Sequence, residues 1–151
     1  MSKKFYIATD HAGYALKAYV KDFISNLGYK IIDLGPDSAD RVDYPDFAKK
    51  CAEAVLADEG SFGILICGTG VGISISANKI VGIRAALCHN GYTAKLSRQH
   101  NDANILCFGE RVVGKGVIDN MIETFASTEF EGGRHEGRVA KIESCTFGDN
   151  L

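Results

Sequence analysis

The sequence predicts an α/β fold: a three-layer, Rossmann-like sandwich on a five-stranded parallel sheet, with an extra helix near the C-terminus. Two observations predict it. Short runs of consecutive apolar residues alternate with segments whose apolar residues recur at helical spacing, from residue 5 to about residue 125. The apolar runs also lack a polar face, so their strands belong in a parallel sheet covered by helices on both sides and joined by right-handed connections.

The predicted strands are short, and helices separate them. The strands cover residues 5–9, 29–33, 62–67, 83–88 and 105–108. From Leu16 to Leu27, apolar residues recur at i, i+3, i+4, i+7, i+8 and i+11, which predicts an amphipathic helix that stops at Gly28. Pro45 suits the first turn of a second helix, which runs to about Asp58.

The remaining predicted helices follow the later strands. They cover residues 73–79, 92–100 and about 117–125. After Ser127 the alternation stops. Residues 129–133 contain two glycines and indicate a hinge, and residues 134–143 predict a last helix without a strand after it. We expect this terminal helix to pack on a neighbour.

The composition is that of one globular domain over residues 1–151. Hydrophobic residues make up 46% and charged residues 24%, which excludes a disordered, collagen-like or coiled-coil chain. The net charge of -2 offers no general field for nucleic acid or an anionic membrane, so a few placed cations must hold any anionic ligand. No apolar run can span a bilayer, and the N-terminus lacks a signal peptide's apolar segment. We expect a cytoplasmic protein without nucleic-acid or membrane partners.

The five cysteines form neither a disulfide framework nor a zinc site, because their number is odd and no C-x-x-C pair occurs. They are Cys51, Cys67, Cys88, Cys107 and Cys145. The simplest interpretation is reduced thiols that serve as small hydrophobic side chains. Cys67 is the candidate exception, since it ends a predicted strand.

In an open parallel sheet, ligands bind at the carboxyl ends of the strands. The candidate site residues are therefore those directly after the strands. They are Asp10 and His11, then Cys67, Gly68 and Thr69, then His89 and Asn90, and finally Gly109, Glu110 and Arg111. We expect a thiol, a hydroxyl, a guanidinium and titratable groups to converge on one edge.

Residues 67–74 read Cys-Gly-Thr-Gly-Val-Gly-Ile-Ser, a glycine-rich turn from a strand into a helix. The segment matches neither G-x-G-x-x-G nor the Walker pattern, so neither nucleotide fingerprint is present. Small residues at a helix N-terminus present backbone N–H groups that bind oxyanions. The alternative is a tight turn whose glycines only supply positive φ angles.

Four polar residues have a plain and a functional interpretation. Arg134 and Arg138 are four residues apart on a predicted helix, where they form either a phosphate clamp or a solvated basic face. His100 suits a C-terminal capping cation, and Asp10 suits the N-cap of the first helix. Each plain interpretation is reasonable alone, but it is less convincing that all of them hold at once.

Together, the motifs closely resemble type B ribose 5-phosphate isomerases, of the same family as the galactose 6-phosphate isomerase subunits. They are Asp-His-Ala-Gly at 10–13, Asp-Tyr-Pro at 43–45, residues 67–74 with Ala-Asn-Lys at 77–79, Ser-Arg-Gln-His-Asn-Asp at 97–102 and Gly-Gly-Arg-His at 132–135. The resemblance implies a homodimer or dimer of dimers, a pocket shared between subunits, and no metal or organic cofactor. The last helix is then expected at the dimer interface.

The resemblance also implies roles in converting ribose 5-phosphate to ribulose 5-phosphate through a cis-enediolate. Cys67 becomes the base that removes the C2 proton, and Thr69 relays a proton between O1 and O2. Gly68 contacts the substrate, and the amides from Gly70 to Ser74, namely those of Gly70, Val71, Gly72, Ile73 and Ser74, hold the enediolate. One family branch carries a glutamate base at the position of Ile73, so this chain falls in the cysteine-base branch.

The other implied roles concern the sugar ring and the phosphate. His100 opens the furanose ring, with Asp10 near the same oxygens. Tyr44 and Asn101 fix sugar hydroxyls. His11, Arg134 and Arg138 contact the phosphate, and Arg111 joins them across the interface.

Three alternatives remain at this point. A six-carbon substrate, allose 6-phosphate or galactose 6-phosphate, suits the same residues. A non-catalytic phosphosugar- or nucleotide-binding module is disfavoured, since Cys67, Thr69 and His100 supply more than an anchor. A receiver-type signalling domain is disfavoured because Cys67 stands where its phosphorylated aspartate should be.

Overall fold

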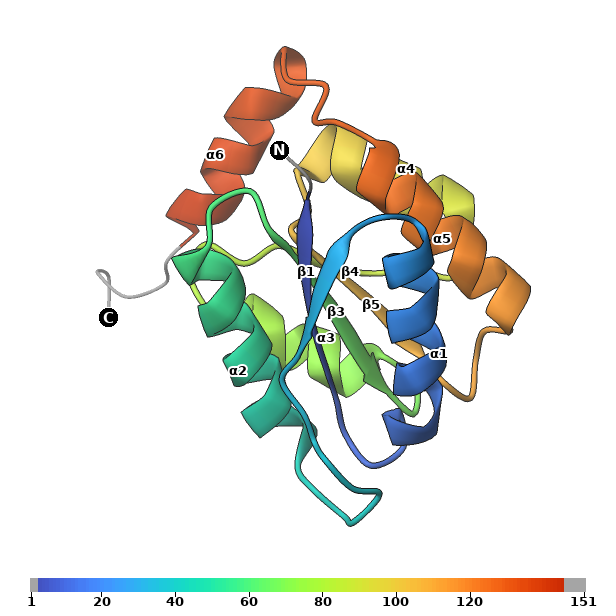
Figure 1. The fold of residues 1–151 in the computed structure, drawn as a ribbon. Helices are drawn as coiled ribbons and strands as arrows, with labels where there is room; N and C mark the ends of the chain where they lie inside the picture. The colour runs from blue at the N-terminus through green and yellow to red at the C-terminus, as the bar shows by residue number, and fades with distance from the viewer. Residues whose placement is uncertain (1–2, 146–151) are drawn as a thin grey trace, which may run out of the picture.

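The computed structural model describes residues 3–145, and it confirms the predicted fold class. The strands are β1 (Lys4–Thr9), β2 (Lys30–Asp33), β3 (Phe62–Cys67), β4 (Ala85–Leu87) and β5 (Ile105–Gly109). The helices are α1 (Tyr14–Asn26), α2 (Tyr44–Ala57), α3 (Val71–Asn78), α4 (Gly91–Asn101), α5 (Lys115–Ser127) and α6 (Arg134–Ser144). All strand pairs are parallel, in the order β2-β1-β3-β5-β4 (Figure 1).

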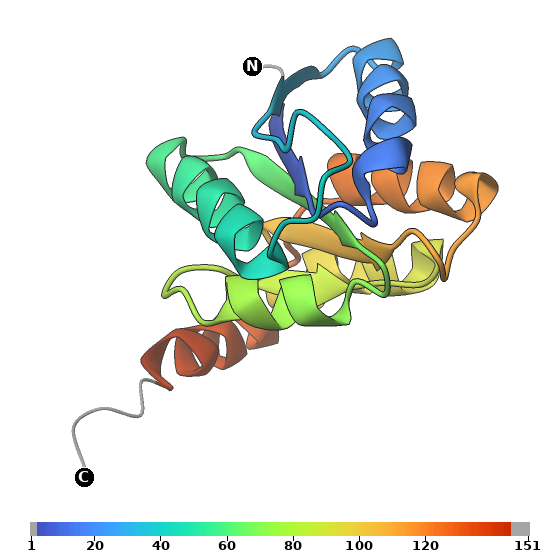
Figure 2. The ribbon, with the colours of Figure 1, turned by 90° about the horizontal axis from the view of Figure 1, so that it is seen from below.

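Two apolar layers enclose the sheet. Helices α2 and α3 cover one face, where Ala48 and Ile73 are fully buried, and α1, α4 and α5 cover the other, where Val20, Ile24 and Phe125 are fully buried (Figure 2). Every residue of the central strand β3 is buried, as its uninterrupted apolar run predicts. No helix in the described part of the chain is both long and apolar enough to cross a membrane.

The edge strand β4 is shorter than the predicted run 83–88. Its free edge is covered by one side chain: Asn78 Nδ2 donates to the Ala85 carbonyl at 2.9 Å, and the Ala85 amide donates to Asn78 Oδ1 at 2.8 Å. An amide side chain thus replaces a neighbouring strand at this position, and it leaves less unpaired backbone on the edge.

Helix α6 lies at the amino ends of the strands, beside the end of α4 (Figure 1). The Glu131 amide donates to the Gln99 carbonyl at 3.0 Å, and an ion pair joins Arg84 to Glu143. The Gly82 amide also donates to Glu143 at 3.2 Å. Contacts before and near the end of α6 therefore fix it to the amino edge of the sheet.

Candidate active site

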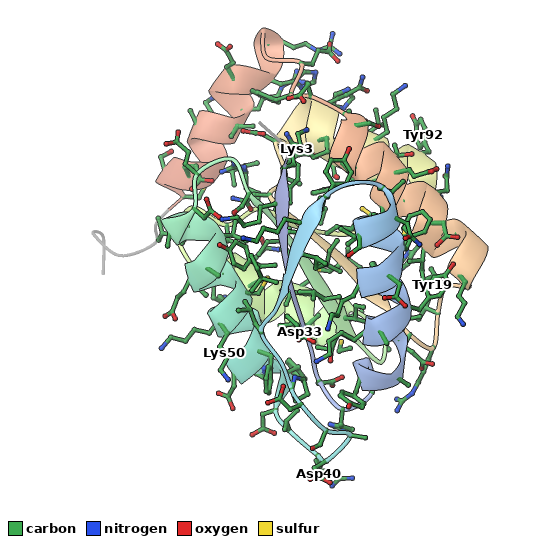
Figure 3. All side chains as sticks on the ribbon, in the orientation of Figure 1. Lys3, Tyr19, Asp33, Asp40, Lys50 and Tyr92 are labelled. Atoms are coloured by element: carbon green, nitrogen blue, oxygen red, sulfur yellow. The ribbon has the colours of Figure 1, made fainter. Side chains whose placement is uncertain are left out.

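The carboxyl ends of β1, β3 and β5 lie side by side. The Asp10 amide donates to the Ile66 carbonyl at 3.2 Å, and the Glu110 amide donates to the Cys67 carbonyl at 3.0 Å. The polar residues after these three strands therefore lie on one edge. In Figure 3 this edge is the end of the sheet near the labelled Asp33, opposite Lys3.

Asp10 stabilises the turn between β1 and α1. Its Oδ1 accepts the amides of Ala12 at 2.9 Å and Gly13 at 3.1 Å, and its side chain is largely buried. The N-cap of α1 is Gly13, so the interpretation of Asp10 as that N-cap is wrong. The carboxylate is held by backbone donors at the edge where β1 meets β3.

Cys67 differs from the other buried cysteines in its position, because it ends the central strand β3 directly before the glycine-rich loop. Its Sγ accepts the Gly70 amide at 3.1 Å, and only 4% of the residue is exposed. Burial raises the pKa of Cys51 to about 12, and burial also raises the pKa values of Cys88 and Cys107 above the ordinary range. Those three therefore remain thiols at neutral pH.

Most amides of residues 70–74 already have partners. Gly70 donates to Cys67 Sγ, and the Val71 amide donates to Thr69 Oγ1 at 3.2 Å. The Ser74 amide donates to the Gly70 carbonyl at 3.2 Å, and its hydroxyl donates to the Val71 carbonyl at 2.8 Å.

The expectation that the Ser74 amide holds an enediolate is therefore wrong. Helix α3 begins at Val71, two residues earlier than predicted, so Ser74 already finds a carbonyl one turn back. The amides of Gly72 and Ile73 lie in the first turn, where no preceding helical carbonyl can accept them. These two are the better oxyanion donors.

Backbone contacts hold the glycine-rich loop against β5. Gly70 has φ +79°, and a Cβ there would lie 2.6 Å from Leu87 Cδ1 and 2.7 Å from the carbonyl carbon of Phe108. A Cβ on Gly109 would lie 2.5 Å from the carbonyl carbon of Thr69. The loop can approach β5 this closely only because these positions are glycines.

We expect Gly70→Ala to lower the free energy of unfolding by about 2–3 kcal/mol, because a left-handed backbone costs an L-residue about 1–2 kcal/mol and the new methyl group collides with β5. Gly28→Ala is the matched control, since Gly28 has φ +90° with nothing within 4 Å of an added Cβ. Denaturant unfolding of both variants at equal protein concentration measures the difference. Equal losses would contradict the close fit of the loop against β5.

Three more predicted residues lie at the same edge of the sheet. The Arg111 Nη1 lies 2.9 Å from the position of a Cβ on Gly68, so the guanidinium covers the loop beside Cys67 of the same chain. The Tyr44 ring lies against Gly72, 2.7 Å from the position of its missing Cβ. His11 Nδ1 is 3.2 Å from the Val42 carbonyl and 3.3 Å from its amide, which connects the edge to the loop before α2.

The other four predicted residues lie at the amino edge. They are His100 and Asn101 at the end of α4, and Arg134 and Arg138 on α6. The Asn101 carbonyl accepts Arg84 Nε at 3.0 Å just before β4 begins. The Asn104 carbonyl accepts the Gly63 amide at 2.9 Å, near the start of β3. Cys67 ends β3, about 13 Å further along at the rise of a β-strand.

One chain therefore does not bring all predicted site residues together. Asp10, His11, Tyr44, Arg111 and residues 67–74 gather at the carboxyl edge, apart from the four at the amino edge. His11 and Arg111 lie at the same edge of one chain, apart from Arg134 and Arg138, so the expectation that Arg111 joins these arginines across an interface stays a prediction. Asn90, a weaker candidate, caps α4 by accepting the Thr93 amide at 2.8 Å.

Sequence reasoning assigned no role to His135, which the structure places against His100. The two rings are stacked, with centroids 4.2 Å apart and planes 12° from parallel. Glu131 completes a group whose candidate ligand atoms lie within 4.8 Å of one another. Imidazole binds a metal through lone pairs in the ring plane, and in parallel stacked rings these lone pairs do not converge on one ion. The stack thus suits ring packing better than metal binding.

Comparisons with known proteins agree with this architecture. The sequence model of the family described as Ribose/Galactose Isomerase matches residues 5–142. Ribose-5-phosphate isomerase B of Escherichia coli K12 is 48% identical over 140 residues, covering 93% of this chain and 94% of that protein.

Solved structures give the same result. The ribose-5-phosphate isomerase B of Clostridium thermocellum has 54% identity and a TM-score of 0.91, with 93% of this chain and 95% of that chain covered. The type B ribose 5-phosphate isomerase of Trypanosoma brucei has 44% identity and a TM-score of 0.92, with 95% and 99% covered. The chain therefore belongs to the ribose/galactose isomerase family.

Proposed function

We propose that the protein interconverts ribose 5-phosphate and ribulose 5-phosphate, an aldose–ketose isomerisation through a cis-enediolate. Family membership supports this reaction class, and the relatives named above supply the substrate. The observation that carries the proposal is Cys67 at the end of β3, with an amide donor on its Sγ and the first turn of α3 beside it. A base and an oxyanion site are what proton transfer next to a carbonyl requires.

In the isomerisation step, the Cys67 thiolate removes the C2 proton of the open-chain aldose. Negative charge then develops on the carbonyl oxygen, where the amides of Gly72 and Ile73 stabilise it. Thr69 moves a proton between O1 and O2. Proton delivery to C1 from the base gives the ketose and restores the thiolate.

Ring opening uses His100, because an imidazole can give or accept a proton near neutral pH. The sugar phosphate binds as a furanose, and proton transfer to the ring oxygen must release the C1 carbonyl before Cys67 can act. The Asp10 carboxylate lies near the same sugar oxygens, and Tyr44 and Asn101 hold the hydroxyls.

A second copy of the chain completes the pocket. Within one chain His100 and Cys67 lie at opposite edges of the sheet, so we assign His100, Asn101, Arg134 and Arg138 to the subunit facing each Cys67. In a two-fold dimer, such an exchange forms two equivalent pockets. Exposed apolar residues support this assembly: Val71 and Ile75 are 46% and 57% exposed on α3, and Ile142 is 48% exposed on α6.

The phosphate is held from both subunits. His11 and Arg111 approach it from the edge that carries Cys67, and Arg134 and Arg138 approach from the opposite subunit, with their guanidinium groups on one face of α6. The free thiols of the described cysteines support a reducing compartment, and we assign the enzyme to the cytoplasm.

We expect Arg138→Ala to raise the KM for ribose 5-phosphate about 10- to 100-fold, because a hydrogen bond to a charged group contributes about 1.5–3 kcal/mol. The control is Lys141→Ala, which removes an exposed cation from the same helix. Steady-state kinetics of both variants measures the effect. An unchanged KM in Arg138→Ala, or an equal rise in Lys141→Ala, would contradict a phosphate contact.

The substrate is tested with purified, metal-free protein. Ketose formation is measured separately with ribose 5-phosphate, allose 6-phosphate and galactose 6-phosphate. We expect the highest kcat/KM with ribose 5-phosphate. A higher value with either six-carbon sugar would replace the proposed substrate, and no turnover of any sugar would exclude the isomerase and leave a binding module.

A further inference from the structure

His135 is the buried partner of a residue to which the proposed mechanism assigns ring opening. It lies in the first turn of α6 and is 3% exposed. His100, at the end of α4, lies flat against it with a centroid distance of 4.2 Å. Thirty-five positions separate the two histidines, so only the fold brings them together.

The backbone around the stack is also fixed. The Glu131 amide donates to the carbonyl of Gln99, the residue before His100, and the His135 amide donates to the Gly132 carbonyl at 3.0 Å. The end of α4 and the start of α6 therefore form one unit. This unit carries all four site residues of the amino edge, so His135 links the imidazole to the arginines on α6.

One ring nitrogen of His135 has no hydrogen-bond partner in the described residues. This atom, Nε2, is buried, and Glu131 Oε1 lies 4.0 Å away from it. A buried polar atom without a partner lowers the stability of a fold. A histidine ring at this position therefore points to a role other than stability.

We infer that His135 is a positioning residue: its buried ring holds the plane of the His100 imidazole in the orientation that proton transfer to the sugar ring oxygen requires. A histidine at a helix end otherwise turns about two side-chain torsions, and a misplacement of about 1 Å can cost about 100-fold in rate. The inference rests on the proposed function, since it assigns His135 to the ring-opening step alone.

The electrostatics of the stack agree with this role. Burial lowers the pKa of His135, and the neighbouring His100, Arg134 and Arg138 lower it further, while Glu131 opposes them. His135 is therefore uncharged near neutral pH. An uncharged ring at this position places no positive charge against the His100 imidazole.

Two substitutions separate ring stacking from simple filling of space. His135→Phe keeps a flat ring and removes the unpartnered nitrogen, whereas His135→Leu fills the site without a plane. For each variant we measure kcat and KM with ribose 5-phosphate, and solvent deuterium entry at C1 of ribulose 5-phosphate, which binds already open. His135→Met is a second non-planar variant if His135→Leu does not fold, as judged by its melting temperature.

We expect His135→Phe to keep kcat within about 3-fold of the parent and His135→Leu to lose about 10- to 100-fold, with KM and deuterium exchange unchanged in both. Equal kcat values in the planar and non-planar variants would overturn the inference, and so would a parallel loss of exchange. The proposed function fails differently: the parent protein would then show no conversion of ribose 5-phosphate, whereas full turnover in His100→Asn would remove only His100 from the reaction. If His100→Asn is defective but His135→Phe and His135→Leu have equal kcat values, only the positioning role is refuted.

Discussion

Cys67→Ala is expected to lower kcat by about 10²- to 10⁴-fold or more, because the substitution removes the base that takes the C2 proton. The side chain is small and its backbone stays in the central strand, so the fold and the affinity for ribose 5-phosphate should remain. Ketose formation measures the first quantity, and titration calorimetry with ribose 5-phosphate measures the second.

Cys88→Ala is the matched control. Cys88 is also buried and follows directly after β4. However, burial raises the pKa of its thiol, and its side chain packs in the hydrophobic core and not beside the glycine-rich loop. We expect its kcat to stay within a few-fold of the parent. Near-normal turnover in Cys67→Ala together with a large loss in Cys88→Ala would show that the base has been assigned to the wrong cysteine.

His100→Asn is expected to depress turnover of ribose 5-phosphate by about 10²-fold or more, because asparagine cannot carry out the proton transfer that opens the ring. Ribulose 5-phosphate cannot close into a furanose through C2, since its 5-position carries the phosphate. Solvent deuterium entry at C1 of the ketose should therefore survive in His100→Asn.

The same exchange measurement on Cys67→Ala supplies the comparison, because removal of the base should abolish exchange from either substrate. Loss of exchange in both variants would mean that His100 serves the enediolate step or the fold. Full turnover of ribose 5-phosphate by His100→Asn would remove it from the reaction altogether.

The layers of the fold were predictable because strand and helix leave different periods in the sequence. β3 is buried on both faces and therefore reads as a continuous apolar run, and its predicted bounds 62–67 match the structure. β4 was predicted too long. Just before β4 the Arg84 amide donates to the Asn104 side chain instead of a strand carbonyl, and such a contact has no periodic signal.

The carboxyl-edge half of the site was also predictable, since the rule about strand ends places Asp10, Cys67 and Arg111 without further information. The first residue of helix α3 could not be predicted from the apolar residues, because the first turn of the helix consists of the glycine-rich sequence that also reads as a loop. That two-residue difference decides the availability of the Ser74 amide.

The distribution of the site residues over two edges of the sheet could not be derived from the positions of the strand ends. His100 lies at the far end of a helix, and its distance from Cys67 depends on the length and direction of α4. The contact between His100 and His135 depends on where α6 packs, which is set by tertiary contacts such as the pairing of Arg84 with Glu143. Neither leaves a pattern in local sequence.

Mixing of two inactive subunits tests the central claim most directly, namely that one subunit's Cys67 works with the other subunit's His100. Cys67→Ala and His100→Asn proteins are unfolded together in equal amounts, refolded and assayed with ribose 5-phosphate, with each variant refolded alone as a control. If the two residues come from different subunits, each mixed dimer contains one intact pocket, and random pairing restores roughly a quarter of the parent activity. If each pocket used a single chain, every pocket in the mixture would lack one residue, and activity no higher than that of the separate variants would contradict the account.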